Sequence, residues 1–181
     1  MADERISALR AMAHPLRVQM LSLLTGVEMS AADVARELGI SHANASYHLR
    51  TLHQAGHIVV TGQERIRGGV AKRYRYVSED SPPRPPTRGR RRSREDLVAY
   101  AEAVGVELKR RLATAPPTRG QFHSDIEAWV DPEVWAEVVD LLRRASRLLH
   151  DGARPPRTAG TRHVSATAWA FAMDDPGVEG R

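Results

Sequence analysis

The sequence contains no cysteine in its 181 residues. Without a thiol, the chain can form no disulfide, thiolate nucleophile, iron–sulfur cluster or sulfur-ligated zinc site. Aromatic residues make up only 5% of the chain, which argues against an aromatic-rich β protein or a carbohydrate-binding protein. No apolar run approaches the roughly 20 residues that span a bilayer, and charged residues follow Met1. We therefore expect a cytoplasmic protein without a membrane segment.

Positive charge is concentrated in the first half of the chain. Residues 1–94 contain 16 basic and 8 acidic side chains, a net charge of +8, whereas residues 95–181 contain 11 basic and 14 acidic side chains, a net charge of −3. A basic half indicates a polyanionic partner such as nucleic acid. Charge alone is equally compatible with a surface that only keeps the chain in solution, so the assignment depends on the motifs.

A segment rich in proline and arginine divides the chain. Residues 79–92 contain almost nothing apolar and cannot bury enough surface to fold alone. We expect this segment to link a unit at 1–78 to a unit at 93–175, with a flexible tail at 176–181. The linker is either a solvated spacer or an arm that follows a DNA backbone.

The first unit begins with short helices. Apolar spacing predicts helices that begin near Pro15, Ser30 and Ser41. Ser30 and Asp33 are spaced as in a capping box, and Gly39 suits the left-handed end of the helix between them and Ser41. Two helices joined by a three-residue turn at 39–41 are typical of a helix-turn-helix.

A hairpin, or wing, is predicted after these helices. The runs 57–61 and 72–77 are rich in β-prone residues, and Gly68-Gly69 between them suits a tight turn. This completes the element order of a winged helix-turn-helix domain. Basic side chains cluster in the hairpin, where they could lie along phosphates or in a minor groove: Arg65, Arg67, Lys72, Arg73 and Arg75.

One face of the helix that follows Ser41 is expected to remain in solvent. Ala45 and Leu49 hold this helix against the preceding one, and at 100° per residue the opposite face is polar. A helix fits the major groove, where polar side chains can contact base edges. The candidates on this face or at its N-terminal end are His42, Asn44, Ser46, Tyr47, Arg50 and Thr51. The alternative is an ordinary three-helix bundle with a polar outer face.

Residues 5–78 resemble ArsR-type winged-helix repressors. The runs HPLRVQMLSLL at 14–24, ADVARELGIS at 32–41 and ASYHLRTL at 45–52 carry the resemblance, with Ala55-Gly56 after them. It implies a homodimer that binds an imperfect inverted repeat in double-stranded DNA, represses transcription and is released by an effector. It also implies a recognition helix from Ser41 to Thr51 and a wing from Gly62 to Ala71. Ser46 and His48 fall at the family's Ser-x-His-Leu step, where His48 would mainly pack and would also contact a phosphate.

The metal sites found in many such repressors are missing. One type uses cysteines, which this chain lacks, and another uses an Asp-x-His pair, whereas here Asp96 is followed by Val98. Both inherited metal sites are therefore excluded on chemical grounds. A mixed site could be drawn from His123, Asp125, His150, Asp151 and His163, but their spacings are unlike those of helical metal ligands. We expect no metal and no other cofactor.

A long helix is predicted at 94–113, capped by Ser93. Its apolar residues recur at spacings typical of a helix–helix seam. The resemblance implies that this helix and the first helix of the chain pair across a dimer axis. The expected interface residues are Ile6, Leu9, Leu97, Val104, Leu108 and Leu112. The alternative is packing within the chain onto residues 119–173.

The remaining residues predict a small strand–helix–strand unit. Residues 121–130 and 162–173 have the pattern of strands, and a helix is expected from Pro132 to about His150. The fold class expected for the whole chain is therefore α+β, mainly helical. Five aromatic side chains of this unit either form its core or line a pocket for a small-molecule effector: Phe122, Trp129, Trp135, Trp169 and Phe171.

Three classes of function compete. The motifs favour a dimeric, sequence-specific DNA-binding transcriptional regulator. A winged-helix module that binds only proteins is the first alternative, and the basic helix and wing argue against it. The second is a small enzyme in the C-terminal unit, but Ser124-Asp125 beside His123 is a chance-level cluster, and the chain has no nucleophile elbow or phosphate loop. We expect no catalytic residues.

Overall fold

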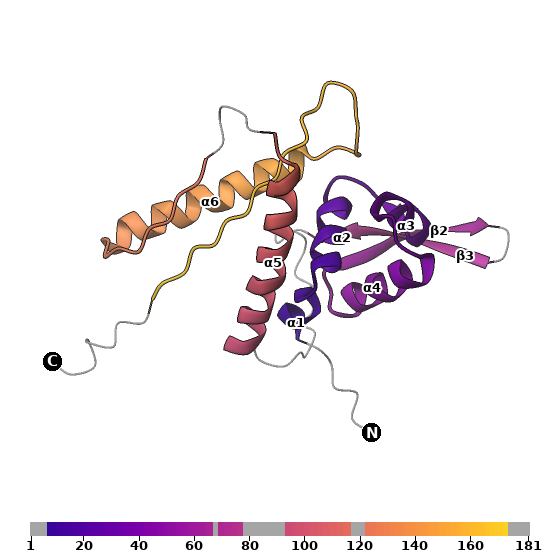
Figure 1. Cartoon of the computed structure of the whole chain (residues 1–181), viewed down its shortest axis with the longest axis horizontal. Helices are drawn as coiled ribbons and strands as arrows, with labels where there is room; N and C mark the ends of the chain where they lie inside the picture. The colour runs from indigo at the N-terminus through magenta and orange to yellow at the C-terminus, as the bar shows by residue number, and fades with distance from the viewer. Residues whose placement is uncertain (1–6, 67–68, 78–92, 117–121, 174–181) are drawn as a thin grey trace.

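The computed structural model describes residues 7–66, 69–77, 93–116 and 122–173. Within these ranges the fold is α+β and mainly helical, as the sequence predicts (Figure 1). The predicted linker at 79–92 and tail at 176–181 lie outside the described residues. The elements in chain order are α1 (Ala8–Met12), α2 (Pro15–Thr25), β1 (Met29–Ser30), α3 (Ala31–Leu38), α4 (His42–Gln54), β2 (Ile58–Ile66), β3 (Gly69–Tyr76), α5 (Arg94–Thr114) and α6 (Pro132–Gly152).

The sheet is antiparallel, with the strand order β1–β3–β2. Strands β2 and β3 pair along their length, with a register shift between Val60 and Gly62. The predicted turn at Gly68-Gly69 falls partly outside the described residues, although β3 begins at Gly69. The sequence does not reveal β1, because two residues are too short to show a period. Met29 of this strand pairs with Tyr74.

The core lies where α2, α3 and α4 meet the start of β2. The apolar faces of the three helices are closed off from solvent there, which fixes the angle between α3 and α4. Partly buried side chains, among them Tyr74 and Tyr76 of β3, pack against the same cluster. The buried members are Met20, Leu21, Leu24, Val34, Ala35, Ala45, Leu49, Leu52 and Ile58.

Helix α5 packs against α1 and α2. The Ser7 hydroxyl, which caps α1, donates a 2.7 Å hydrogen bond to the Asp96 carboxylate in the first turn of α5. Further along, Glu107 is 1% exposed and accepts hydrogen bonds from Gln19, Arg110 and Arg111. The long helix is thus fixed to the winged-helix part by buried polar contacts as well as by apolar packing.

The C-terminal unit differs from the prediction. Helix α6 forms where expected, but residues 122–130 and 162–173 form no strand, and no residue of α6 is buried. Alternating sequence favours extended backbone, but a strand also needs a neighbour that pairs with it. The described residues of this unit therefore do not form the predicted small α+β core.

The segment after α6 returns to the rest of the molecule. The His150 ring stacks on Tyr76, with ring centroids 5.4 Å apart. The backbone of Arg154 approaches Gly26 so closely that a Cβ there would lie 2.8 Å from the Arg154 carbonyl oxygen. Beyond this, Arg157 contacts α3, and Trp169 packs on Tyr100 of α5 at 5.3 Å. Figure 1 shows α6 itself projecting away from the winged-helix part.

Candidate nucleic-acid interface

The geometry of the α3–turn–α4 unit is set by its caps. The Ser30 hydroxyl accepts from the Asp33 backbone N–H at 3.2 Å, while the Asp33 carboxylate accepts from the Ser30 N–H at 3.0 Å. The Ser30 hydroxyl also donates a 2.7 Å hydrogen bond to the Asp33 carboxylate, and this bond, followed by the one from the Ser30 N–H, lowers the pKa of Asp33. Gly39 ends α3 with a φ of 65°, a left-handed conformation that costs a glycine little. Ser41 caps α4 through the Asn44 N–H, and all of these caps agree with the sequence prediction.

One face of α4 is buried as predicted. Ala45, Leu49 and Leu52 are fully buried, and His48, on the same face, is only 5% exposed. Burial, followed by the nearby positive charges of His14 and Arg17, lowers the pKa of His48 to about 4. A buried, neutral imidazole is a packing residue. The predicted packing role of His48 is confirmed, but its predicted phosphate contact has no support because the ring does not reach the surface.

The opposite face of α4 is open to solvent. Tyr47 is 59% exposed, and His42 and Arg50 are exposed as well. The other candidates on the helix, Asn44, Ser46 and Thr51, are half-buried. Figure 1 shows α4 on the outside of the winged-helix part, on the side away from α6. The face can therefore meet a duplex without moving another element.

The hairpin β2–β3 projects beside α4 (Figure 1). It carries exposed basic side chains. Arg65, Lys72 and Arg75 are exposed, whereas Arg67 lies outside the described residues. Arg73 differs from the rest. Its guanidinium contacts the Glu64 carboxylate at 3.4 Å and donates to the Glu28 carbonyl at 3.2 Å, so it helps to hold the hairpin in place.

The structure adds one residue to the candidate interface. Arg17, in the first turn of α2, lies close enough to Tyr47 for their charges to interact. It also lies near the rings of His14 and His48, whose centroids are 4.6 Å apart. Its charge therefore lies near α4, while its guanidinium donates to the Arg10 carbonyl at 3.4 Å. The sequence places Arg17 in that turn through the helix start at Pro15, but only the packing of α2 on α4 brings it near α4.

The residues predicted to form the dimer interface differ in their exposure to solvent. Leu97, Leu108 and Leu112 are exposed on α5, while Val104 is only 9% exposed and is covered within the chain. Leu9 is half-buried, and Ile6 lies outside the described residues. The exposed leucines remain available to a partner. The alternative of packing onto the C-terminal segment holds only for part of α5, such as Tyr100.

The predicted aromatic pocket does not form in the single chain. Phe122 and Trp129 are 91% and 87% exposed, Phe171 is 65% exposed, and Trp169 packs on α5. Trp129 lines a hollow of about 420 Å³ with Val130, Asp131 and Val134, but not with the other predicted aromatic residues. Trp135, on α6, is half-buried. The five side chains therefore neither enclose a ligand nor form a core.

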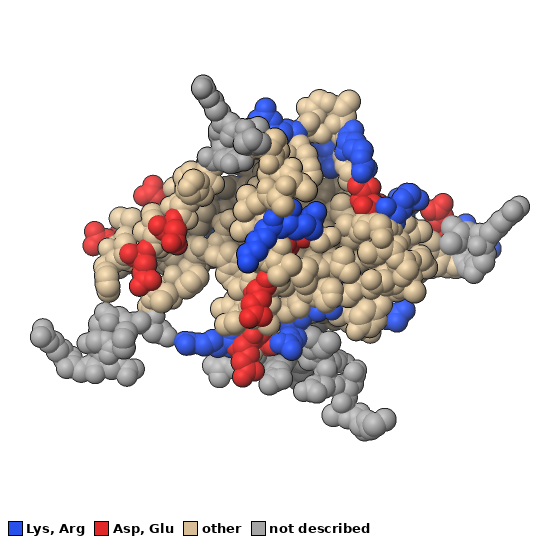
Figure 2. Space-filling model, viewed as in Figure 1, with Lys and Arg blue, Asp and Glu red and all other residues tan. Residues whose placement is uncertain are grey.

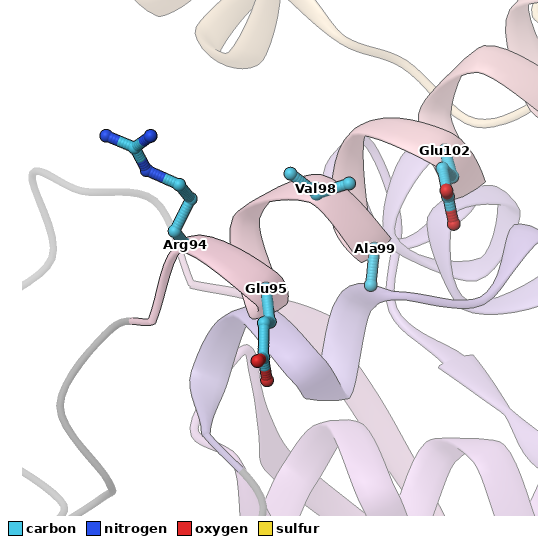
Figure 3. A pocket seen from close by; sticks show the side chains of 5 residues that line it. All are labelled: Arg94, Glu95, Val98, Ala99 and Glu102. Atoms are coloured by element: carbon cyan, nitrogen blue, oxygen red, sulfur yellow. The ribbon is translucent and has the colours of Figure 1, made fainter.

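A second hollow lies along α5 itself. It has a volume of about 560 Å³ and is lined by Arg94, Glu95, Val98, Ala99 and Glu102, all from α5 (Figure 3). This is a helix surface rather than a catalytic cleft. Among the described residues, no group of three or more His, Asp or Glu side chains could hold a metal ion. Within the same ranges, no helix combines the length and apolar character that a membrane span requires.

Comparison with known proteins identifies the same part of the chain. Residues 12–60, which include α2, α3 and α4, match the family model of a helix-turn-helix domain. No curated protein matches the sequence. The match supports a DNA-binding regulator.

Proposed function

We propose that the chain is a homodimeric, cytoplasmic repressor of the ArsR type that binds an inverted repeat in double-stranded DNA and catalyses no reaction. The observation that carries the proposal is the exposed face of α4, with Tyr47 and Arg50 beside a basic hairpin and inside a matched helix-turn-helix domain. Helix α4 would enter the major groove. Its own opposite face is buried, so the orientation of this helix is fixed before DNA arrives.

The charges suit two kinds of contact. Arg50 projects from α4, where an arginine can form two hydrogen bonds with a guanine edge. Arg65, Lys72 and Arg75 on the hairpin suit phosphates, which give affinity without sequence preference. Specificity would thus come from α4, and much of the salt-dependent affinity from the hairpin.

The dimer proposal rests on an apolar stripe along α5. Leu97, Ala101, Leu108 and Leu112 lie within 60° of one another around the helix and are all exposed. The small Ala101 would allow two helices to approach closely. A two-fold axis through this stripe would present two copies of α4 to two half-sites, which accounts for an inverted repeat.

The experiment is selection of duplexes by the purified full-length chain from a random-sequence pool. The proposal predicts enrichment of an inverted repeat with half-site centres about 10 base pairs, or a multiple of this, apart, bound by two protomers. Arg50→Ala should weaken the enrichment, and the matched change Arg147→Ala on α6 should leave it unchanged. An unenriched pool would contradict the proposal, and a salt-insensitive protein complex would instead favour the interaction-module alternative.

A further inference from the structure

The C-terminal unit exposes more apolar surface than a monomer normally does. Phe122, Trp129, Trp169 and Phe171 are 91%, 87%, 41% and 65% exposed. With about 150–250 Å² for each aromatic side chain, these four alone expose roughly 400–700 Å². Single exposed hydrophobic side chains are common on a monomer, but four large aromatic side chains exposed in one small unit are not. Helix α6 adds a further apolar face, so this region needs a partner.

The apolar residues of α6 follow a heptad pattern. Val134, Val138, Leu141, Ala145 and Leu148 recur at alternating spacings of four and three residues, which is the seam of a helix pair. All five are exposed, and Leu148 is 74% exposed. The half-buried side chains of α6, such as Leu142, lie on the flank of the seam. The helix therefore turns one flank toward its own chain and leaves the seam uncovered.

The charges along α6 indicate which helix packs against its seam. The first half carries Glu133, Glu137 and Asp140, whereas the second half carries Arg143, Arg144 and Arg147 and one acidic residue, Asp151, in its last turn. In Figure 2, acidic side chains gather at the end of the molecule where α6 begins. Two copies of α6 side by side in the same direction would place like charges together. Two antiparallel copies would place the acidic half of each against the basic half of the other.

The register of the charges fits the seam. Glu137 and Arg144 each precede a seam residue, Val138 and Ala145, and so lie on the same flank. They are seven residues, or about 10.5 Å, apart along one helix, too far to pair within the chain. In an antiparallel pair the same flanks face each other, so Glu137 would meet Arg144 of the partner, and two-fold symmetry would make this contact twice.

In the antiparallel pair, the C-terminal end of one α6 also fits against the N-terminal end of the other. The partner's Leu148 would lie near Val134, beside the hollow of about 420 Å³ that Trp129, Val130 and Val134 help to line. We propose that α6 pairs antiparallel with α6 of a second copy of this chain, with Leu141 next to the two-fold axis. This contact is separate from the stripe on α5 and does not depend on DNA binding.

The absence of cysteine makes a direct test simple. A single cysteine is introduced at Leu141 in the full chain and treated, without DNA, with a bismaleimide of about 8–10 Å, the spacing of packed helix axes. Leu141→Cys should give a covalent dimer, and the matched control Arg147→Cys on the polar face should not. Because DNA is not used, failure of operator binding would leave this result unchanged.

A charge exchange tests the register. Adding Glu137→Arg to the Leu141→Cys chain should reduce the covalent dimer about tenfold, because two attractive contacts become repulsive. Adding Arg144→Glu as well should restore it. The proposal is overturned if Leu141→Cys cross-links no better than Arg147→Cys, as a different partner or packing onto the same chain would cause. It is also overturned if the double exchange does not restore the cross-link.

Discussion

Arg157 binds Glu37 through both ends of its guanidinium group, with distances of 2.8 and 3.1 Å to the two carboxylate oxygens. The two residues are 120 positions apart, and Glu37 lies in the helix-turn-helix. Arg157 holds a left-handed backbone with a φ of 63°, an uncommon conformation for a residue with a Cβ. The contact therefore connects the segment after α6 directly to the DNA-binding unit.

Removal of either partner should loosen this connection. We expect Arg157→Ala and Glu37→Ala each to speed hydrogen exchange in residues 153–158, with no additional effect in the double variant. Arg157→Lys should behave like Arg157→Ala, because an ammonium group cannot bridge two oxygens as the planar guanidinium does. The exposed Arg154→Ala is the control and should leave exchange in this segment unchanged. Additive effects of the two single changes would show that the pair does not act as a unit.

Glu107→Gln should destabilise the fold by about 1.5–3 kcal/mol, since hydrogen bonds between buried charged groups are the stronger ones. Burial raises the pKa of Glu107, but the hydrogen bonds from Arg110, Arg111 and Gln19 outweigh it and lower the pKa overall. The stabilisation is thus present at neutral pH and is lost as the pH falls through the depressed pKa.

Urea denaturation at pH 7 measures this difference in the free energy of unfolding. The control is Glu102→Gln, a change on the exposed side of the same helix, which should stay within about 0.5 kcal/mol of the wild type. Equal effects of the two changes would mean that the Glu107 contacts do not hold α5 in place.

His48 should make the fold less stable in mild acid. Its folded pKa of about 4 lies below the ordinary value of 6.5, so between these values the unfolded chain binds more protons than the folded one. Stability from this group therefore falls as the pH drops from 6.5 to 4, by on the order of 2–3 kcal/mol. His48→Leu should remove this part of the pH dependence, measured by urea denaturation at pH 7 and pH 5. His42→Leu, an exposed change on the same helix, should preserve it.

Ala101→Arg should block dimerisation through α5. A long charged side chain in the middle of the apolar stripe would keep two helices apart, and the position is exposed, so the monomer should fold normally. With the α6 contact weakened by Glu137→Arg in both chains compared, we expect the dimer dissociation constant, measured by sedimentation equilibrium, to rise at least tenfold. Glu102→Arg, one residue away and off the stripe, should have a much smaller effect. Unchanged association in Ala101→Arg would place the dimer axis elsewhere.

Local signals in the sequence predict the DNA-binding half well. The capping box at Ser30, the left-handed Gly39 and the cap at Ser41 each depend on residues within a few positions, and all three form as predicted. The buried and exposed faces of α4 also follow directly from its helical period. His48 is the exception, because the expected phosphate contact came from the family resemblance and the helical period places the ring inside.

The errors arise where distant residues decide the outcome. Alternation at 162–173 predicts extended backbone but cannot supply a neighbouring strand, so no sheet forms there. Val104 belongs to the predicted seam, but contact with other helices covers it. The contacts of Arg157 with Glu37 and of Ser7 with Asp96 span 120 and 89 positions, and no local sequence pattern predicts them.

The most direct test of the central claim is a comparison of DNA affinity between wild type and Arg50→Ala across a salt series. Fluorescence anisotropy would measure binding to the selected site and to a scrambled duplex. The account predicts that wild type prefers its site by about a thousandfold or more at physiological salt. Arg50→Ala should lose about 1–3 kcal/mol on the site alone, whereas Lys72→Ala should weaken binding to both duplexes and flatten the salt slope by about one unit. Equal binding of the site and the scrambled duplex, with no effect of Arg50→Ala, would contradict α4 as the recognition helix.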